Sequence, residues 1–171
     1  MLLSQKSKTY EEYFLTKYLP PERIEEKVSE IRREGKTIAT LNGSFDLMHA
    51  GHLHILYEAS LQADILILAL NSDASIKKYK SPLRPIISLP NRLRMMAALG
   101  FVDLVTAFEE TNPIEILKKI KPDVHVNGAE YGADCIEAET VRSFGGKVHI
   151  VQLVPGLSTS QIIEKVKQTC A

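Results

Sequence analysis

The sequence of 171 residues has no tryptophan and only two cysteines, Cys135 and Cys170. These cysteines are far apart and form no C-x-x-C pair, which argues against a disulfide framework and favours two free thiols in a reducing compartment. No window approaches the roughly 20 apolar residues of a membrane span, and the apolar stretch at the N-terminus is too short for a signal-peptide core. We therefore expect a cytoplasmic protein with no membrane partner.

The chain also has no net charge, because 21 Lys and Arg residues balance 21 Asp and Glu residues. Nothing in this balance favours a long nucleic-acid track, so no nucleic-acid partner is expected. Hydrophobic residues make up 44% and charged residues 25%, as in ordinary globular proteins. A domain of this size buries about 70% of its unfolded surface, which is enough for a sizeable core.

The N-terminal region, residues 1–19, shows no clear periodicity and is expected to be a tail. Residues 20–171 are expected to form a single domain that starts with a helix at about 22–34. In this helix Ile24, Val28 and Ile31 repeat at helical spacing, and Gly35 is a suitable C-terminal stop.

Five apolar runs alternate with helical patterns along the rest of the chain. The strands are predicted at 37–43, 64–71, 102–108, 123–128 and 147–153, and the helices at 49–62, 75–79, 91–99, 113–120, 135–145 and 158–168. This alternation predicts an α/β, Rossmann-like fold with a five-stranded parallel sheet and helices on both faces. Ligands of such folds lie beyond the carboxyl ends of the strands, where Gly43, Asn71, Gly128 and the loop 155–160 fall.

His49 and His52 stand at the predicted junction between the first strand and the first helix, in the string H-A-G-H. A helix start has unpaired N–H groups and the positive end of the dipole, and Ala50 and Gly51 leave room for a phosphate to approach the backbone. Imidazoles at this place can donate hydrogen bonds to phosphoryl oxygens during displacement at phosphorus. The pair therefore predicts a phosphate-binding, catalytic position.

Two histidines at this spacing could instead bind zinc. The motif contains no glutamate as in H-E-x-x-H, so no metal site is predicted. The other histidines, His54, His125 and His149, are expected in packing or surface roles.

The segment NGSFDLMHAGH resembles the signature of the nucleotidyltransferase superfamily that includes cytidylyltransferases and phosphopantetheine adenylyltransferase. Further along the chain, LNSDASIKKYKSPLRPI, NRLRMMAALGFVD, VNGAEYGAD and GGKVHIVQLVPGLSTSQII resemble, in order and spacing, the adenylyltransferase domain of bacterial ADP-heptose synthase. The resemblance covers about residues 21–168. It implies transfer of AMP from ATP to D-glycero-β-D-manno-heptose 1-phosphate, giving ADP-heptose and pyrophosphate for lipopolysaccharide core synthesis.

The resemblance also implies roles for individual residues at the triphosphate. His49 and His52 would contact it and stabilise the transition state, and Lys80 and Arg92 would hold the leaving pyrophosphate. The backbone of Gly43, Ser44 and Phe45 would lie beside it. The family often has a glutamate two residues before the arginine, where this chain has Pro90.

The nucleoside is expected at the end of the fourth strand, where Asn127, Gly128 and Glu130 occupy the family's base-recognition segment, commonly K-G-G-D-Y. Gly128 and Tyr131 match this pattern, whereas Asn127, Ala129 and Glu130 replace its other residues. An ordinary strand-ending Asn-Gly turn is the alternative. The hydroxyls of Ser158, Thr159 and Ser160 crowd a helix start, which suits phosphate binding as well as ordinary capping.

The sugar phosphate is assigned by the resemblance to Asp73 and Arg84. Asp73 could equally cap the short helix that follows it, and Arg84 could be a solvated surface charge. Asp46 could cap the first crossover helix or orient a histidine.

These residues suggest in-line attack of the sugar phosphate on the α-phosphorus of ATP, with Mg²⁺ bound through the ATP phosphates and no tightly bound cofactor. A cytidylyltransferase acting on glycerol 3-phosphate or a similar alcohol phosphate is the first alternative, although the arginine common before its last motif is replaced here by V-P-G. A non-catalytic nucleotide-binding module is the second. A separate heptose kinase chain is expected to supply the acceptor, and a homodimer is possible for this family.

Overall fold

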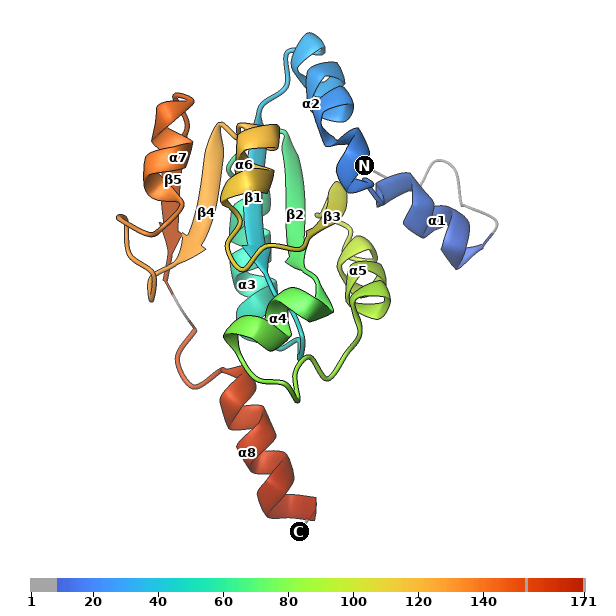
Figure 1. Ribbon diagram of the computed structural model, residues 1–171, viewed down its shortest axis with the longest axis vertical. Helices are drawn as coiled ribbons and strands as arrows, with labels where there is room; N and C mark the ends of the chain where they lie inside the picture. Colours follow the sequence, from blue (N-terminus) through green and yellow to red (C-terminus); the bar gives the residue numbers. More distant parts are fainter. Residues whose placement is uncertain (1–8, 153, 171) are drawn as a thin grey trace.

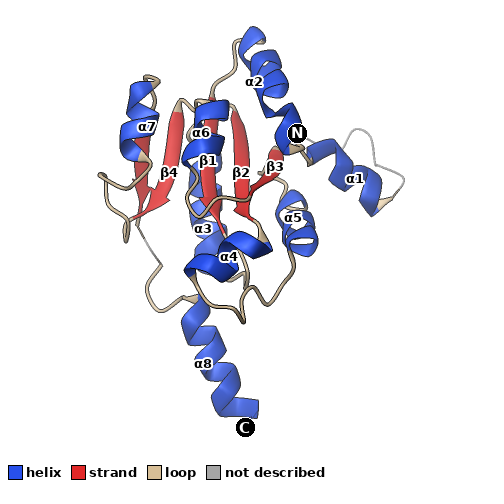
Figure 2. Ribbon diagram, viewed as in Figure 1, coloured by secondary structure: helices blue, strands red, loops and turns tan. Residues whose placement is uncertain are grey.

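The computed structural model describes residues 9–152 and 154–170, whose centre is a parallel sheet with helices on both faces (Figures 1 and 2). Its strands are β1 (Ile38–Gly43), β2 (Ile65–Asn71), β3 (Leu104–Phe108), β4 (Val124–Gly128) and β5 (Lys147–Val151). They lie in the order β3-β2-β1-β4-β5, and all neighbouring pairs are parallel. The predicted fold class is confirmed.

The helices divide between the two faces of this sheet (Figure 1). One face is covered by α2 (Ile24–Arg33), α6 (Ile114–Ile120) and α7 (Ala138–Ser143), and the other by α3 (Ala50–Ser60) and α5 (Leu89–Ala97). The remaining helices are α1 (Tyr10–Lys17), which packs on α5, a 3-10 turn η1 (Pro21–Arg23), α4 (Asp73–Tyr79) after β2, and α8 (Thr159–Cys170), which runs away from the sheet.

The sequence of β2 is apolar at successive positions and does not alternate between apolar and polar residues. Successive side chains of a strand point to opposite faces, and both faces of this strand are covered. Leu68 belongs to the same buried cluster as Leu56 of α3, whereas Ile67 belongs to the cluster of Val28 on α2. The two cores together hold the carboxyl ends of the strands at one edge of the molecule.

The N-terminal region differs from the expected tail, because residues 10–17 form α1. Its first turn carries a capping box, in which Glu12 N–H donates to Thr9 Oγ1 and Thr9 N–H donates to the Glu12 carboxylate. The side chains of Phe14 and Leu19 are buried in the two cores. The T-x-x-E signal was readable in the sequence, but a two-turn helix with one buried residue has too little periodicity to be recognised.

The predicted helix at 22–34 is present as η1 and α2, and Gly35 ends it with φ +71°, a left-handed conformation that favours glycine. The predicted strand at 147–153 ends at Val151, and residue 153 lies outside the described residues. Across residues 9–152 and 154–170, no helix combines the length and apolarity that a membrane span requires.

Candidate active site

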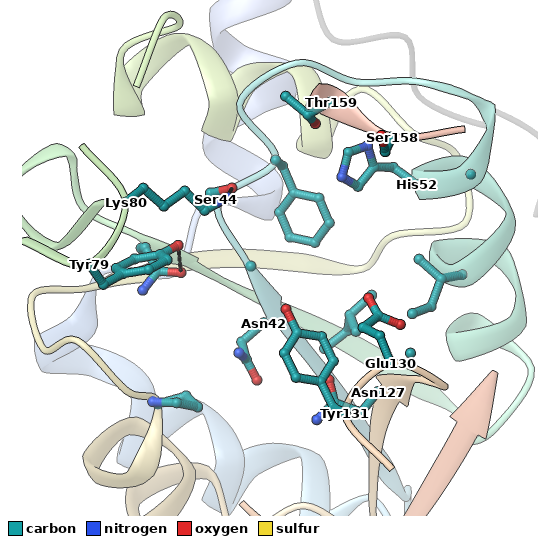
Figure 3. A pocket seen from close by; sticks show the side chains of 18 of the residues that line it. Asn42, Ser44, His52, Tyr79, Lys80, Asn127, Glu130, Tyr131, Ser158 and Thr159 are labelled. Carbon is teal, nitrogen blue, oxygen red and sulfur yellow. Dashed lines mark hydrogen bonds between the residues drawn. The ribbon is translucent and has the colours of Figure 1, made fainter. Parts of the chain in front are cut away.

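A cleft of about 550 Å³ opens at the carboxyl ends of β1 and β4 (Figure 3). These strands are neighbours in the sheet although two others separate them in the chain, so the strand order reverses between them. Open α/β sheets bind ligands at this switch point, and the volume is in the range of small-molecule sites. The position of the site therefore follows from the topology.

The histidine pair forms part of the cleft wall. His49 is the extended residue before α3, with φ −146° and ψ 171°, and His52 lies in the first turn, so His49 itself is not part of the helix. The His52 N–H donates to the His49 carbonyl at 2.9 Å, and the ring centroids are 4.0 Å apart. This turn brings the two imidazoles together at a helix N-terminus, as expected of an anion site.

Both imidazoles lie in surroundings that disfavour their charged form. Burial lowers the pKa of His52 to about 4, with smaller contributions from His49 and Lys80, and burial also lowers the pKa of His49. The Nδ1 atom of each ring is buried without a hydrogen-bond partner within the described part of the chain. A bound triphosphate would offer these nitrogens oxygen acceptors and would favour their protonated form.

Phe45 shapes the loop between β1 and the histidines. Its backbone is left-handed, with φ +46°, and its ring lies so close to Gly43 that a Cβ there would meet it at 3.3 Å. The ring packs edge-on against His52 with centroids 5.7 Å apart. Gly43 and Phe45 thus set the floor beside the histidines, and both line the cleft.

The cationic side chain of Lys80 lines the cleft wall, and the residue lies just after α4. Its Nζ donates to Ser44 Oγ at 2.9 Å, which places the two side chains together as Figure 3 shows. Burial lowers the pKa of Lys80, and the neighbouring Arg84 adds to this effect. An incoming phosphate would relieve this repulsion, so the position suits an anion.

Arg92 is placed differently from its predicted contact with the phosphates. Its side chain is fully buried, and its guanidinium donates to the carbonyls of Ile87, Ser44 and Asn71 and to Asp73 Oδ1 at 2.6 Å. These bonds tie the loop after β1 to the end of β2 beneath the cleft, and Arg92 does not line it. The structure thus places Arg92 away from the cleft surface that the predicted phosphate contact requires, and its hydrogen bond fixes the Ser44 backbone instead.

Asp73 and Arg84, predicted to hold the sugar phosphate, also lie outside the cleft wall. Asp73 accepts hydrogen bonds from the first backbone N–H of α5 and from Arg92, and Ser72 rather than Asp73 caps α4. Arg84 forms an ion pair with the buried Asp46.

Asp46 does not cap α3, and its hydrogen-bond partners among the described residues are Arg84, Ile86 and Ile87 rather than a histidine. Although burial opposes ionisation, hydrogen bonds from the Ile87 and Ile86 amides and from Arg84 outweigh it and lower the pKa of the Asp46 carboxyl. Asp46 thus anchors the loop before α5.

The end of β4 forms the wall of the cleft opposite Lys80, with Asn127, Glu130 and Tyr131 on it (Figure 3). The Glu130 carboxylate lies over Gly128, where a Cβ would come within 2.1 Å of Oε2, so this position requires glycine unless Glu130 moves. Asn127 Nδ2 donates to Glu137 at 3.3 Å. The predicted nucleoside residues are thus brought together at one end of the cleft.

The start of α8 provides two of its three predicted hydroxyls. Ser158 and Thr159 line the cleft, whereas Ser160 is exposed and does not. Ser158 Oγ accepts from the N–H of Gln161 at 3.2 Å, which is the bond of an ordinary N-cap. Thr159 Oγ1 donates to the Leu47 carbonyl at 3.4 Å.

Several cleft residues were missed by the sequence reasoning. They are mostly neutral polar or acidic side chains: Asn42, Tyr79, Thr111, Asn112 and Glu137. For Asn42, Thr111 and Asn112, the place at or just after the carboxyl end of a strand is the signal that could have found them. No group of three His, Cys, Asp or Glu side chains suited to a metal ion occurs within the described residues.

The chain is similar in sequence to several known proteins. The chain is 43% identical over 136 residues to the bifunctional protein HldE of Syntrophotalea carbinolica, and 42% identical over 142 residues to that of Pseudomonas entomophila. These alignments cover 79% and 82% of this chain but 28% and 30% of the relatives, so the chain spans about three-tenths of their length.

Two solved structures resemble the fold. The lipopolysaccharide core biosynthesis protein of Thermoplasma volcanium aligns with a TM-score of 0.57 at 27% identity, covering 70% of this chain and 98% of that one. A pantoate-beta-alanine ligase of Francisella tularensis, complexed with beta-gamma ATP and beta-alanine, aligns with a TM-score of 0.60 at 13% identity. The alignment covers 89% of this chain and 77% of the ligase chain, and at this identity it shows the fold alone.

The family assignment rests on the motif-bearing part of the chain. The cytidylyltransferase-like family model matches residues 40–167, from the first strand to the last helix, and this span includes the histidine pair, the end of β4 and the hydroxyls of α8. The resemblance to nucleotidyltransferases inferred from the sequence is thereby confirmed, and the chain belongs to the cytidylyltransferase-like family.

Proposed function

We propose that the protein transfers AMP from ATP to D-glycero-β-D-manno-heptose 1-phosphate, giving ADP-heptose and pyrophosphate. The observation that carries this proposal is the pair of imidazoles 4.0 Å apart at the start of α3, in a cleft that also contains Lys80. The choice of the heptose substrate is supported by the identity of more than 40% to the bifunctional HldE proteins.

The proposed reaction is a single in-line displacement. A phosphate oxygen of the sugar phosphate attacks the α-phosphorus, the bond from this phosphorus to the oxygen bridging to the β-phosphorus breaks, and pyrophosphate leaves with that electron pair. A phosphate monoester is already nucleophilic at neutral pH, so no general base is needed. Catalysis then consists of positioning and charge stabilisation.

Different residues of the chain would take different parts in this positioning and charge stabilisation. His49 and His52 would hydrogen-bond the phosphoryl oxygens on which charge develops, and Lys80, placed by Ser44, would hold the pyrophosphate. Arg92 would keep the loop of Ser44 in place. Mg²⁺ bound by the triphosphate would supply further charge neutralisation, because it prefers phosphate oxygens and water to a protein cage.

The nucleoside end of the site would take Asn127, Gly128 and Glu130, and Ser158 and Thr159 would face the phosphates. A cytidylyltransferase acting on an alcohol phosphate is the alternative, since the segment 127–131 departs from the family's usual residues. Cytoplasmic location, homodimerisation and supply of the acceptor by a separate heptose kinase are also proposed. Light scattering of the purified protein tests the dimer.

The direct experiment measures pyrophosphate release from ATP or CTP with Mg²⁺ and a panel of sugar and polyol phosphates. We expect the fastest release with ATP and heptose 1-phosphate. Faster release with CTP and glycerol 3-phosphate would establish the alternative. No release with any pair would refute the enzymatic proposal and leave a nucleotide-binding module.

Replacing His52 by alanine should lower kcat/KM by about 100-fold, as for the loss of an oxyanion donor. The melting temperature should stay close to that of the wild type, because the ring lies on the cleft wall. His54→Ala, on the same helix but exposed, is the matched control and should retain full activity. Equal rates for both variants would show that the chemistry takes place elsewhere.

A further inference from the structure

Glu137 is a buried carboxylate at the cleft that no motif singled out. Its residue is 5% exposed, it lines the cleft, and it immediately precedes α7. Its carboxylate accepts a hydrogen bond from Asn127 Nδ2 at a long 3.3 Å. Burial raises the pKa of the Cys135 thiol against the opposing effect of Asn127, and the adjoining Glu137 carboxylate adds to the rise, so a weak S–H donor also lies beside Glu137.

The carboxylate thus accepts one side-chain hydrogen bond, from Asn127, and lies beside the Cys135 thiol. Within the described residues, no Lys, Arg or His nitrogen forms an ion pair with Glu137, and no metal-binding group includes it. A buried carboxylate is costly unless donors surround it, and it can accept several hydrogen bonds. A ligand group that binds the remaining acceptor positions of the Glu137 carboxylate must therefore be a hydrogen-bond donor. Such a group would reach Glu137 from the cleft, which this residue lines.

The sheet order indicates which part of a nucleotide reaches this carboxylate. Lys80 follows β2, on one side of β1, whereas Glu137 follows β4 on the other side. If, as proposed above, the phosphates lie between the histidines and Lys80, the base lies toward β4. Glu130, at the same end, is exposed, whereas Glu137 is a buried residue of the cleft lining, so Glu137 would meet the base at its far edge.

We propose that Glu137 reads the exocyclic amino group of the nucleobase. This inference rests on the proposed nucleotidyl transfer and adds a specificity residue to it. Adenine and cytosine carry an amino group at the corresponding position, whereas guanine and uracil carry a carbonyl oxygen, which a carboxylate repels. The residue thus selects for amino-bearing bases and does not itself choose ATP over CTP.

The test measures binding directly, so that it does not depend on the sugar substrate. Dissociation constants for ATP and for purine riboside triphosphate, in which hydrogen replaces the 6-amino group, are determined by calorimetry for the wild type and for Glu137→Gln. We expect ATP to bind the wild type about 10- to 100-fold more tightly than the analogue, as for a hydrogen bond to a charged group. In Glu137→Gln the two dissociation constants should become nearly equal, because ATP should bind more weakly while the binding of the analogue stays unchanged.

The control is Glu139→Gln, two residues along on the exposed face of α7, which should keep the wild-type ratio. A purely structural role of Glu137 would weaken both ligands equally, and this outcome overturns the inference. The inference is also overturned if Glu137→Gln changes the ratio of the dissociation constants of ATP and 2′-deoxy-ATP, because the residue would then contact the ribose hydroxyl and not the amino group. If the wild type binds ATP selectively but releases no pyrophosphate, the proposed function fails while the assignment of Glu137 stands.

Discussion

Replacing Arg92 by methionine should lower the free energy of unfolding substantially and leave the KM for ATP nearly unchanged. The guanidinium is fully buried and holds three carbonyls and the Asp73 carboxylate, so its loss leaves the carbonyls of Ser44, Asn71 and Ile87 without these donors. The Asp73 side chain is 38% exposed, so most of the cost comes from the three carbonyls, which at about 1 kcal/mol or more for each lost donor amount to about 3 kcal/mol. For a chain of this length that corresponds to a fall of about 6–12 °C in melting temperature.

The measurement is urea unfolding followed by circular dichroism, with the free energy taken from the midpoint and slope. Arg94→Met is the matched control on the same helix, because Arg94 pairs with Glu11 at the surface and its loss should cost about 1 kcal/mol or less. A loss of less than about 1 kcal/mol for Arg92→Met, together with a large rise in KM for ATP, would refute the positioning role and restore the phosphate contact.

Two further predictions concern stability. His125 is fully buried, and burial lowers its pKa to about 4 from the usual 6.5, so its contribution is complete above pH 6.5 and is lost as the pH falls toward 4. Between pH 7 and pH 5 this amounts to about 2 kcal/mol, which His125→Asn should remove from the pH dependence of urea unfolding; an unchanged slope contradicts the burial argument. Phe14→Ala should cost about 3 kcal/mol by thermal or urea unfolding, whereas the exposed neighbour Leu15→Ala should cost less than about 0.5 kcal/mol. Equal effects would show that α1 is not part of the core.

Most of the fold could be predicted because the strands are covered on both faces. A continuous apolar run such as residues 65–71 is readable without knowledge of its neighbours. The first helix could not be read in the same way, since its 8 residues bury only Phe14, and that burial depends on α5 and on β3, which come much later in the chain.

The sequence by itself determined the alternation of strands and helices, the edge of the sheet where the cleft lies, and the histidine pair at a helix start, because each of these depends on local periodicity and short spacing. Only the tertiary structure decided which charged residues reach the cleft. Arg92 and Asp73 satisfy each other beneath it, Arg84 and Asp46 pair beside it, and Glu137 is turned into it. The reason is physical: a charged side chain takes the partners that the folded backbone places within hydrogen-bond reach, and those partners come from distant parts of the chain.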